Sequence, residues 1–428
     1  MTTYTTDSKR RIFPTSCLSI LVAFLLAGCS ANQQYSSTKV PLYVVDSYLQ
    51  DKPPELRHIY AEVVEEGPRN AVLNHLEAGL AAMYYGRHDL AEYSFDEALL
   101  GIETVYSNTE RARKARSLWY EEGMKDFKGE PYERAMAYYY RGLLFLRRGD
   151  FENATACFRN GVLQDAFAEE EQNRCDFALL IFMEGWASQC LGDMELAEAA
   201  YDEVKILRPD FKPPGRNHNT LIIAETGTSP RKVADGIGHY ELKYRRGKHF
   251  TEKAAHISIA GKRDRMYPIE DIFWQSSTRG GRLVDKIVEG KAVFRKTHEE
   301  IGTALTDVSA NALIFSPSFG DVEGDVQKLS AALGLIGIAE MATAARTKPH
   351  ADTRYWCNLP DAVHVFTCNS EANTHTITIS FLDSSGSEIF GLRKKCEIEL
   401  SDTGHGIAWI KSCSAIPSNQ LSGGYKNE

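Results

Sequence analysis

The 428-residue sequence lacks the short motifs that would indicate a catalytic activity, a metal site or a cofactor site. Its nine cysteines include no Cys-x-x-Cys pair and its twelve histidines no His-Glu-x-x-His, which argues against thiol exchange and against a tight metal site. There is no Gly-x-Ser-x-Gly elbow, and Gly236-x-Gly238 lacks the third glycine of a dinucleotide-binding loop. The net charge of −9 carries no basic excess to neutralise phosphates. We therefore expect no catalytic motif, no metal, no cofactor and no nucleic-acid partner.

An apolar run long enough to cross a bilayer is also missing at the N-terminus. Basic residues 9–11 precede an apolar run over residues 17–27, which is well short of the ~20 residues that a membrane-spanning helix needs. This order is typical of a secretory signal peptide, over residues 1–28. The sequence Leu26-Ala27-Gly28-Cys29 resembles the bacterial lipobox. The resemblance implies cleavage before Cys29 and lipidation of its thiol.

The predicted lipid determines where the protein is located. Acyl chains such as palmitate anchor a protein because each buried methylene contributes ~0.8 kcal/mol, and two or more chains hold it stably on a membrane. Bacterial lipoproteins retained at the inner membrane typically have Asp after the lipidated cysteine, whereas Ser30 follows Cys29 here. The resemblance thus implies the outer membrane, with the protein facing the periplasm. Residues 29–54 are expected to form the lipidated tether.

One spacing pattern occurs three times between residues 72 and 209. In each copy two glycines lie seven residues apart, and an alanine and an aromatic residue follow the second glycine: Gly79, Gly86, Ala91 and Phe95; Gly142, Gly149, Ala154 and Phe158; Gly185, Gly192, Ala197 and Tyr201. The first glycine lets two antiparallel helices approach, the second ends the first helix in a left-handed turn, and the later residues pack the second helix onto the first. The pattern resembles the tetratricopeptide repeat (TPR). It predicts an all-α, TPR-like solenoid over residues 55–210, in preference to a plain helical bundle.

The first helix of each predicted pair would line the groove of such a solenoid. Its usual groove positions are apolar here: Leu76, Leu80, Met83, Tyr139, Leu143, Leu146, Phe182 and Trp186. A large exposed apolar patch usually marks an interaction site. Two alternatives stay open: a partner segment docks in the groove as a helix, or the protein's own chain fills it.

The second half of the chain has a different pattern. Residues 211–215 (Phe-Lys-Pro-Pro-Gly) predict a linker, and short β-rich runs follow at 220–226, 239–244, 256–259 and 269–274. Helical patterns occupy 283–306 and 327–346. Four later runs, at 363–367, 376–381, 395–400 and 406–410, predict a small antiparallel sheet. We therefore expect an α+β fold, with an α+β C-terminal domain at residues 218–412 and a tail at 413–428.

Three cysteines fall in this predicted C-terminal domain, and a fourth is the first residue of the predicted tail. The periplasm permits disulfides, and Cys357, Cys368, Cys396 and Cys413 allow three pairings between which the sequence does not choose.

Three segments carry a second resemblance. Residues 128–134 (KGEPYER), 227–232 (GTSPRK) and 351–360 (ADTRYWCNLP) look like the hallmark segments of an uncharacterised bacterial outer-membrane lipoprotein family with TPR repeats. The resemblance implies a cell-envelope protein and brings no catalytic residues with it. From the residues themselves, Asp352 and Arg354 are predicted to pair, or to cap a turn that leads Trp356 into the core. The loop 227–232 is predicted to be a simple turn rather than an anion site.

These observations favour a non-enzymatic envelope lipoprotein, in which the repeats act as a scaffold that binds another envelope protein. One alternative is a regulator that stimulates a cell-wall synthase. Another is an envelope glycan-acting enzyme that uses carboxylates of the C-terminal domain, because 58 Asp and Glu residues leave a pair assembled in space open. The enzyme hypothesis requires a cleft with two convergent acidic side chains within residues 218–412.

Overall fold

The computed structural model describes residues 40–105, 126–166, 176–235, 241–249, 251–277, 352–371 and 374–416. The predicted signal peptide, Cys29, Gly236 and Gly238, and the helical patterns at 283–306 and 327–346 lie outside the described residues, as do residues 29–39 of the predicted tether and 417–428 of the predicted tail. Among the helices described, none combines the length and the apolar character that a bilayer span requires.

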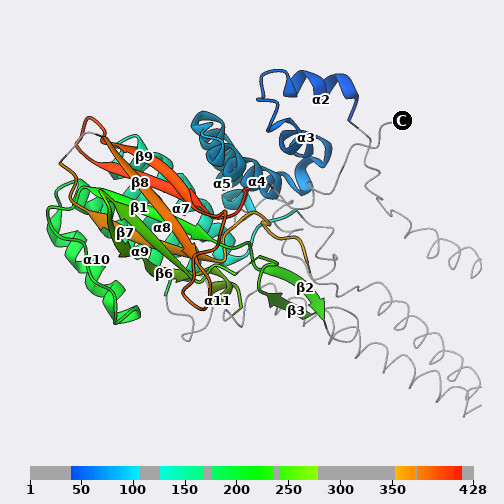
Figure 1. The fold of residues 1–428 in the computed structure, drawn as a ribbon. Coiled ribbons are helices and arrows are strands. Elements are labelled where there is room, and N and C mark those ends of the chain that lie inside the picture. Colours follow the sequence, from blue (N-terminus) through cyan, green and yellow to red (C-terminus); the bar gives the residue numbers. More distant parts are fainter. Residues whose placement is uncertain are drawn as a thin grey trace, which may run out of the picture.

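Helices dominate the first half of the described chain. They are α2 (Leu42–Leu49), α3 (Arg57–Glu65), the short 3-10 helix η1 (Gly67–Arg69), α4 (Ala71–Tyr84), α5 (His88–Val105), α7 (Pro131–Arg147), α8 (Phe151–Ala166), α9 (Ala178–Cys190) and α10 (Met194–Leu207). Three-residue turns join α4 to α5, α7 to α8 and α9 to α10, and the members of each pair pack on one another. The pairs are stacked, with α5 against α7 and α8 against α9 (Figure 1).

The repeated glycines explain the geometry of these pairs. The glycine in each turn has a positive φ, which an L side chain rarely adopts: +70° at Gly86, +74° at Gly149 and +83° at Gly192. The glycine in each first helix faces the aromatic ring of the second helix. A Cβ built there would lie 3.1 Å from Phe95 for Gly79, 2.4 Å from Phe158 for Gly142 and 2.8 Å from Tyr201 for Gly185. The alanines of the pattern, Ala91, Ala154 and Ala197, are fully buried.

Strands and one short helix make up the second half. They are β1 (Thr220–Thr226), β2 (Arg231–Asp235), β3 (Glu241–Arg245), β4 (Ala254–Ile259), β5 (Lys262–Arg265), β6 (Tyr267–Asp271), α11 (Ile272–Ser277), β7 (Ala362–Cys368), β8 (Thr374–Leu382), β9 (Lys394–Glu399) and β10 (Gly406–Lys411). One sheet has the order β10-β1-β7-β6 and is called the mixed sheet below, because β10 runs parallel to β1. A second sheet, β5-β4-β8-β9, is antiparallel throughout, and β2 pairs with β3 in a hairpin.

The mixture of helices and sheets confirms the α+β class, but the predicted C-terminal sheet is wrong. The four last strands do not form one antiparallel sheet: β7 and β10 flank β1 in the mixed sheet, whereas β8 and β9 join β4. Strand pairing depends on partners that lie far away in the sequence, and local alternation does not identify them. The strand predicted at 269–274 is also too long. It ends at Asp271, whose side chain accepts a hydrogen bond from the Trp274 amide at 2.9 Å and starts helix α11.

The helices, the mixed sheet and the antiparallel sheet form successive layers, and the teal helices α7 and α8 lie behind the strands in Figure 1. Along β1, Leu221 and Ile223 belong to the same buried cluster as the side chains of the helices. The alternate residues Ile222 and Ala224 pack against the antiparallel sheet. Phe211, in the predicted linker, is buried in the first cluster. The regions 55–210 and 218–412 therefore share the first of these two buried clusters.

Candidate functional site

The eight residues predicted to line an open groove are all buried. None of Leu76, Leu80, Met83, Tyr139, Leu143, Leu146, Phe182 and Trp186 is more than 7% exposed. The mixed sheet occupies the side of α7 and α9 where the sequence predicts a partner helix: Tyr140 donates a hydrogen bond to Glu225 of β1 at 2.9 Å, and the Leu179 amide donates one to Glu270 of β6 at 3.2 Å. An exposed apolar groove is therefore absent from the described structure, because the chain covers these side chains itself.

The three segments of the family resemblance meet at one buried junction. Lys232 Nζ lies 3.1 Å from Glu133 Oε2 and 3.3 Å from Glu130 Oε1. The other oxygen of Glu133 accepts a hydrogen bond from the Trp356 amide at 2.8 Å, and Ser229 Oγ donates one to the Trp356 carbonyl at 2.7 Å. Burial by itself lowers the pKa of Lys232, but the two carboxylates raise it above its ordinary value. Lys232 is thus a structural cation that joins these segments, and it is enclosed rather than offered to an anion.

The prediction for Asp352 and Arg354 is confirmed. Their side chains form an ion pair at 2.7 Å, and the Arg354 amide also donates a hydrogen bond to Asp352 Oδ1 at 3.0 Å. Two residues further on, Trp356 is fully buried, with its ring 6.2 Å from that of Phe95 and 5.6 Å from that of Tyr140. This turn has a structural role, because it positions Trp356 in the core.

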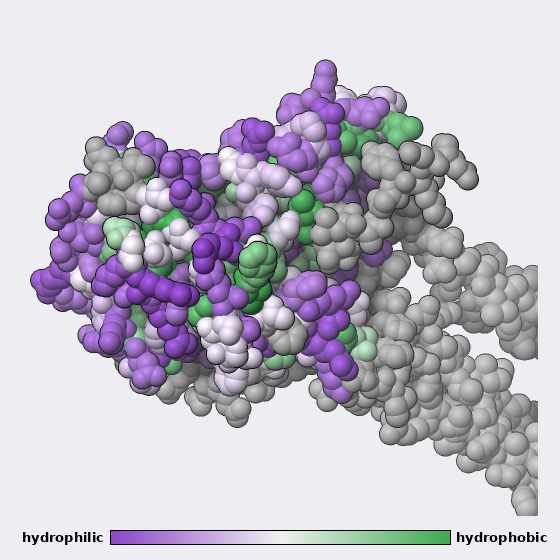
Figure 2. Space-filling model, in the orientation of Figure 1, coloured by the Kyte–Doolittle hydropathy of each residue, from purple (hydrophilic) through white to green (hydrophobic). Residues whose placement is uncertain are grey.

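The exposed surface offers a different candidate site. The face shown in Figure 2 is mostly hydrophilic, with hydrophobic residues in small separate patches. A cavity of ≈ 840 Å³ lies between the end of α10, strand β6, helix α11 and the segment that precedes β4. We call it the α11 cleft, and its lining includes Ile206, Arg208, Arg246, Glu252, Glu270, Asp271, Trp274 and Asp361. Two apolar members of this lining are largely exposed, Ile206 at 79% and Trp274 at 52%.

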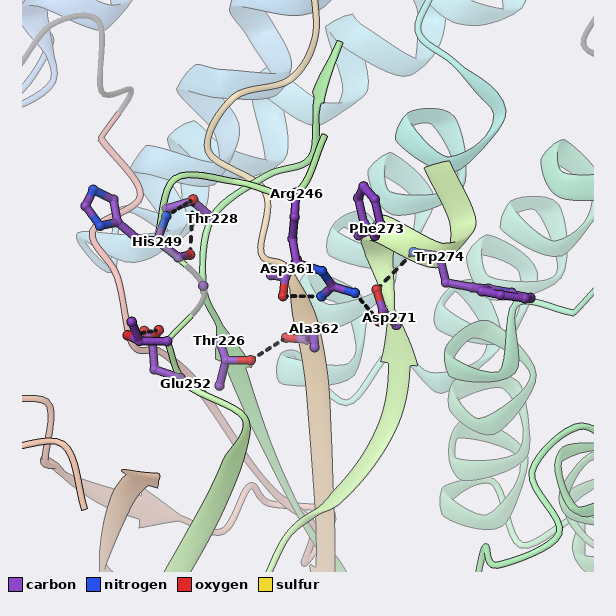
Figure 3. A network of polar contacts seen from close by, with 12 residues as sticks. Thr226, Thr228, Arg246, His249, Glu252, Asp271, Phe273, Trp274, Asp361 and Ala362 are labelled. Carbon is purple, nitrogen blue, oxygen red and sulfur yellow. Dashed lines mark hydrogen bonds and ion pairs between the residues drawn. The ribbon is translucent and has the colours of Figure 1, made fainter. Parts of the chain in front are cut away.

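Arg246 organises the polar part of the α11 cleft (Figure 3). Its Nη1 lies 2.6 Å from Asp361 Oδ2, and its Nη2 lies 2.8 Å from Asp271 Oδ2. The guanidinium carbon is 4.6 Å from the centre of the Phe273 ring, a cation–π contact. Asp271 in turn caps α11 through the Trp274 amide. The Arg246 guanidinium therefore holds the carboxylates of Asp271 and Asp361 in place. Because Asp271 caps the start of α11, the same ion pair also fixes the position of Trp274.

The carboxylates of the cleft differ in how their oxygens are used. Glu270 is fully buried and accepts hydrogen bonds from Arg208 at 3.0 Å, from Gln275 at 3.1 Å and from the Leu179 amide. Burial raises the pKa of Glu270 to about 7 and that of Asp361 to about 6, although the arginines oppose the shift. Asp361 Oδ1 is buried and has no hydrogen-bond partner in the described part of the chain. Glu270 thus holds helices together, while Asp361 keeps one acceptor unused.

No metal-ligand cluster and no disulfide is found among the residues that the structure describes. Within residues 40–416, apart from the gaps given above, no three His, Cys, Asp or Glu side chains are grouped as metal ligands. Cys357, Cys368, Cys396 and Cys413 form no disulfide with one another in the described part of the chain.

Sequence reasoning missed the residues that build this cleft. Arg246 is 25 residues from Asp271 and 115 residues from Asp361, and no spacing motif connects them. The available signal was local: Asp271 stands three residues before Trp274, as an N-cap would. The strand expected at 269–274 concealed it.

Comparison with family models, with curated proteins and with solved structures finds no match to this chain, so its function is argued from the geometry described above.

Proposed function

We propose that the protein is a non-enzymatic lipoprotein of the bacterial outer membrane that binds another envelope protein in the α11 cleft. Lipid on Cys29 anchors it and it faces the periplasm, as the likeness of residues 26–29 to a lipobox supports. The helix pairs are TPR-like repeats, supported by the repeated spacing and by the glycine–aromatic contacts. They act as a rigid support for the mixed sheet, and the partner binds beside that sheet.

The observation that carries this proposal is the pairing of exposed apolar residues with a fixed polar centre. Ile206 and Trp274 line the same cleft as Asp271 and Asp361, which Arg246 holds in place. Protein interfaces concentrate their binding energy on Trp, Tyr and Arg in such pockets, and side chains that are already ordered cost less entropy on binding. A partner segment that places an apolar side chain against Trp274 and a donor towards the partly exposed carboxylate of Asp271 fits this arrangement.

The test is site-specific photo-crosslinking in intact cells. A photo-crosslinking amino acid at position 274 is expected to capture one envelope protein that the same amino acid at position 390 does not capture. Phe390 is a matched control because it is fully exposed and does not line the cleft. In the chain that carries the crosslinker at 274, Ile206→Glu should lower the yield at least about tenfold, as expected for the loss of an interface hot spot.

Helix α10 supplies a control for that substitution. Leu196 is half-exposed on the same helix but does not line the cleft, so Leu196→Glu should leave the yield unchanged. Cys29→Ser should reduce capture by releasing the protein from the membrane. Equal yields with Ile206→Glu and Leu196→Glu would contradict binding in the α11 cleft. If the captured partner is a cell-wall synthase whose rate rises when the protein is added, the function is that of a regulator.

A glycan-acting enzyme is a second candidate, favoured by one observation. Asp361, with a pKa raised to about 6 and a free oxygen, shares the cleft with Asp271, and glycosidases use a pair of carboxylates of which one is a proton donor. Incubation of the purified full-length protein with peptidoglycan separates the two candidates. Hydrolysis that Asp361→Asn reduces by at least ~10²-fold would support the enzyme. Absence of hydrolysis leaves binding as the function.

A further inference from the structure

A second cavity, of ≈ 310 Å³, lies between the α4–α5 turn, the end of α7 and strands β9 and β10. We call it the basic pocket. Its lining contains no Asp or Glu from the described residues, but it contains Arg147, Lys394, Lys395, Lys411 and His88. In a protein with a net charge of −9, a cavity whose charged lining residues are all basic is a local reversal of sign.

One of these cations is already neutralised. Lys411 Nζ lies 2.8 Å from Glu225 Oε2, and both side chains are buried. Glu225 also accepts hydrogen bonds from Tyr140 and Trp409, at 2.9 and 2.8 Å. Lys411 therefore belongs to the junction between α7 and the mixed sheet, and it contributes an apolar stem rather than a free charge to the pocket.

Arg147, Lys394 and Lys395 are different, because they form no ion pair with any residue that the structure describes. Their neighbours in the sequence do. Arg148 forms an ion pair with Glu92 at 2.7 Å, and Arg393 forms one with Glu388 at 2.7 Å. Adjacent basic residues thus divide into those that are paired on the surface and three unpaired ones that line the pocket.

The start of helix α5 adds one further feature that suits an anion. His88 lines the pocket, but burial and the neighbouring Arg147 lower its pKa, so it is not counted among the cations. It is also the first residue of an 18-residue helix, whose first amides have no carbonyl partners within the helix. Asp89 lies in the same turn with an exposed side chain, outside the lining.

We propose that the basic pocket binds a terminal phosphate group through the Arg147 guanidinium and the ammonium group of Lys394, with the exposed Lys395, on the other face of β9, adding positive charge at the rim. A guanidinium contacts two phosphate oxygens at once, while lysines supply point charges to the remaining oxygen. The volume lies at the lower end of the range for small-molecule sites, and Leu143 and Trp409 provide apolar walls for the group that carries the phosphate. This site is separate from the α11 cleft and does not depend on the function proposed for it.

The test uses the full-length protein, purified in a detergent and in a buffer free of phosphate. Isothermal titration calorimetry is performed with inorganic phosphate, with phenyl phosphate and with benzoate. Phenyl phosphate is expected to bind at least about tenfold more tightly than benzoate, because a phosphate dianion interacts more strongly with these cations than a carboxylate monoanion does. Added salt should weaken the binding, because the cations are partly exposed.

Two sets of variants test whether phenyl phosphate binds in the basic pocket. Combined Arg147→Gln, Lys394→Gln and Lys395→Gln should weaken the binding of phenyl phosphate at least about tenfold, since no charge is left for the ligand. Combined Arg148→Gln and Arg393→Gln removes neighbouring cations that are already paired, and it should leave affinity unchanged. Thermal melting checks that both proteins are folded.

The source of the phosphate is resolved with phosphatidylcholine vesicles that contain or lack phosphatidic acid. The Cys29→Ser full-length chain is used, so that the predicted lipid anchor does not itself bind the vesicles. Phenyl phosphate binding that the triple variant abolishes supports a soluble phosphomonoester. Vesicle binding that requires both phosphatidic acid and the three cations supports a lipid headgroup. The proposal is overturned if no phosphate probe binds, or if the triple variant binds as the wild type does.

Discussion

At the scale of single residues, the buried junction around Lys232 connects segments that lie far apart in the sequence. Its ammonium group and its two carboxylate partners come from segments 99 residues apart, and all three side chains are nearly inaccessible to water. Ions this deeply buried are stable only together, because each one alone would lack compensation for its lost hydration.

Substituting Lys232→Met tests this dependence. The variant leaves Glu130 and Glu133 as a buried pair of like charges, and we expect the free energy of unfolding to fall by about 3–5 kcal/mol in urea denaturation. Adding Glu133→Gln to Lys232→Met should recover part of the loss. Lys262→Met is the matched control, because Lys262 is exposed and its pair with Asp264 contributes at most about 0.5 kcal/mol. Equal losses for the two lysines would argue against the junction.

Residue-level prediction from the sequence succeeds when the partners are near neighbours. The Asp352–Arg354 pair spans two residues, so its turn could be predicted and was found. The ion pair of Lys232 with Glu133 could not be derived from spacing, since nothing in either segment identifies the other. Both segments are among those that resemble a lipoprotein family, but this resemblance does not indicate that they contact each other.

At the scale of elements, the helix pairs depend on how closely α7 approaches α8. A Cβ on Gly142 would lie 2.4 Å from Phe158 Cε1, well inside van der Waals contact. Gly142→Ala should therefore overpack the pair and destabilise the protein by about 1–3 kcal/mol, measured by chemical denaturation. The same substitution combined with Phe158→Leu should be less harmful than Gly142→Ala alone.

Gly192→Ala separates this packing effect from backbone strain. At Gly192 φ is +83° and a Cβ would meet nothing within 4 Å, so only the strained conformation costs free energy, about 1 kcal/mol. Adding Phe158→Leu should not relieve this cost. If Phe158→Leu restored stability equally to Gly142→Ala and to Gly192→Ala, steric contact with Phe158 would not be the cause of the destabilisation by Gly142→Ala.

Elements were predictable to the extent that their signals are local. The glycine spacing places the helix pairs, and β1 has the predicted bounds of 220–226, because alternation and turn residues act over a few positions. The assembly of those strands was not predictable. The register of β10 beside β1 depends on which apolar faces meet, and the prediction of one C-terminal sheet failed at that step.

At the scale of the whole molecule, buried ionisable groups set the pH range of stability. Burial raises the pKa of Glu77 and Glu270 to about 7. The native state therefore holds these protons more tightly than the unfolded state does, and their contribution to stability is lost as the pH rises through about 7. Burial lowers the pKa of His75 and His364 to about 4, so their contribution is present above about 6.5 and is lost as the pH falls.

Between pH 6.5 and pH 8 each of the two glutamates should lower the free energy of unfolding by about 0.8 kcal/mol, because its native pKa lies inside this interval. Each of the two histidines opposes this by about 0.4 kcal/mol, because half of its unfolded form is still protonated at pH 6.5. The contribution of Glu77 is isolated by comparison with Glu77→Gln, which does not titrate and whose side-chain oxygen can still accept the hydrogen bond from the Cys357 amide. In denaturation at the two pH values the wild type should lose about 0.8 kcal/mol relative to Glu77→Gln, and equal changes in the two proteins would refute the assignment.

The candidate sites belong to this largest scale, which is why the sequence did not reveal them. Arg246 and Asp361 meet in the α11 cleft, and Arg147 and Lys394 meet in the basic pocket, only after helices and both sheets have been brought together. The groove predicted from the repeats is covered by the mixed sheet. Sequence patterns identified the supporting helices, and tertiary packing determined which surface stays open.

The parallel pairing of β10 with β1 has a consequence for the order of folding. Residues 406–411 lie about 185 positions after their partners at 220–225, so the edge of the mixed sheet closes only when nearly the whole described chain is present. A chain that emerges from a ribosome or a translocase N-terminus first has helices α4 to α10 available long before the last strand arrives. Until then Glu225 lacks Lys411 and Trp409, and the apolar side of α7 is incompletely covered. Nascent chains shorter than about 411 residues are thus the form of this protein most exposed to aggregation, proteolysis and chaperone binding.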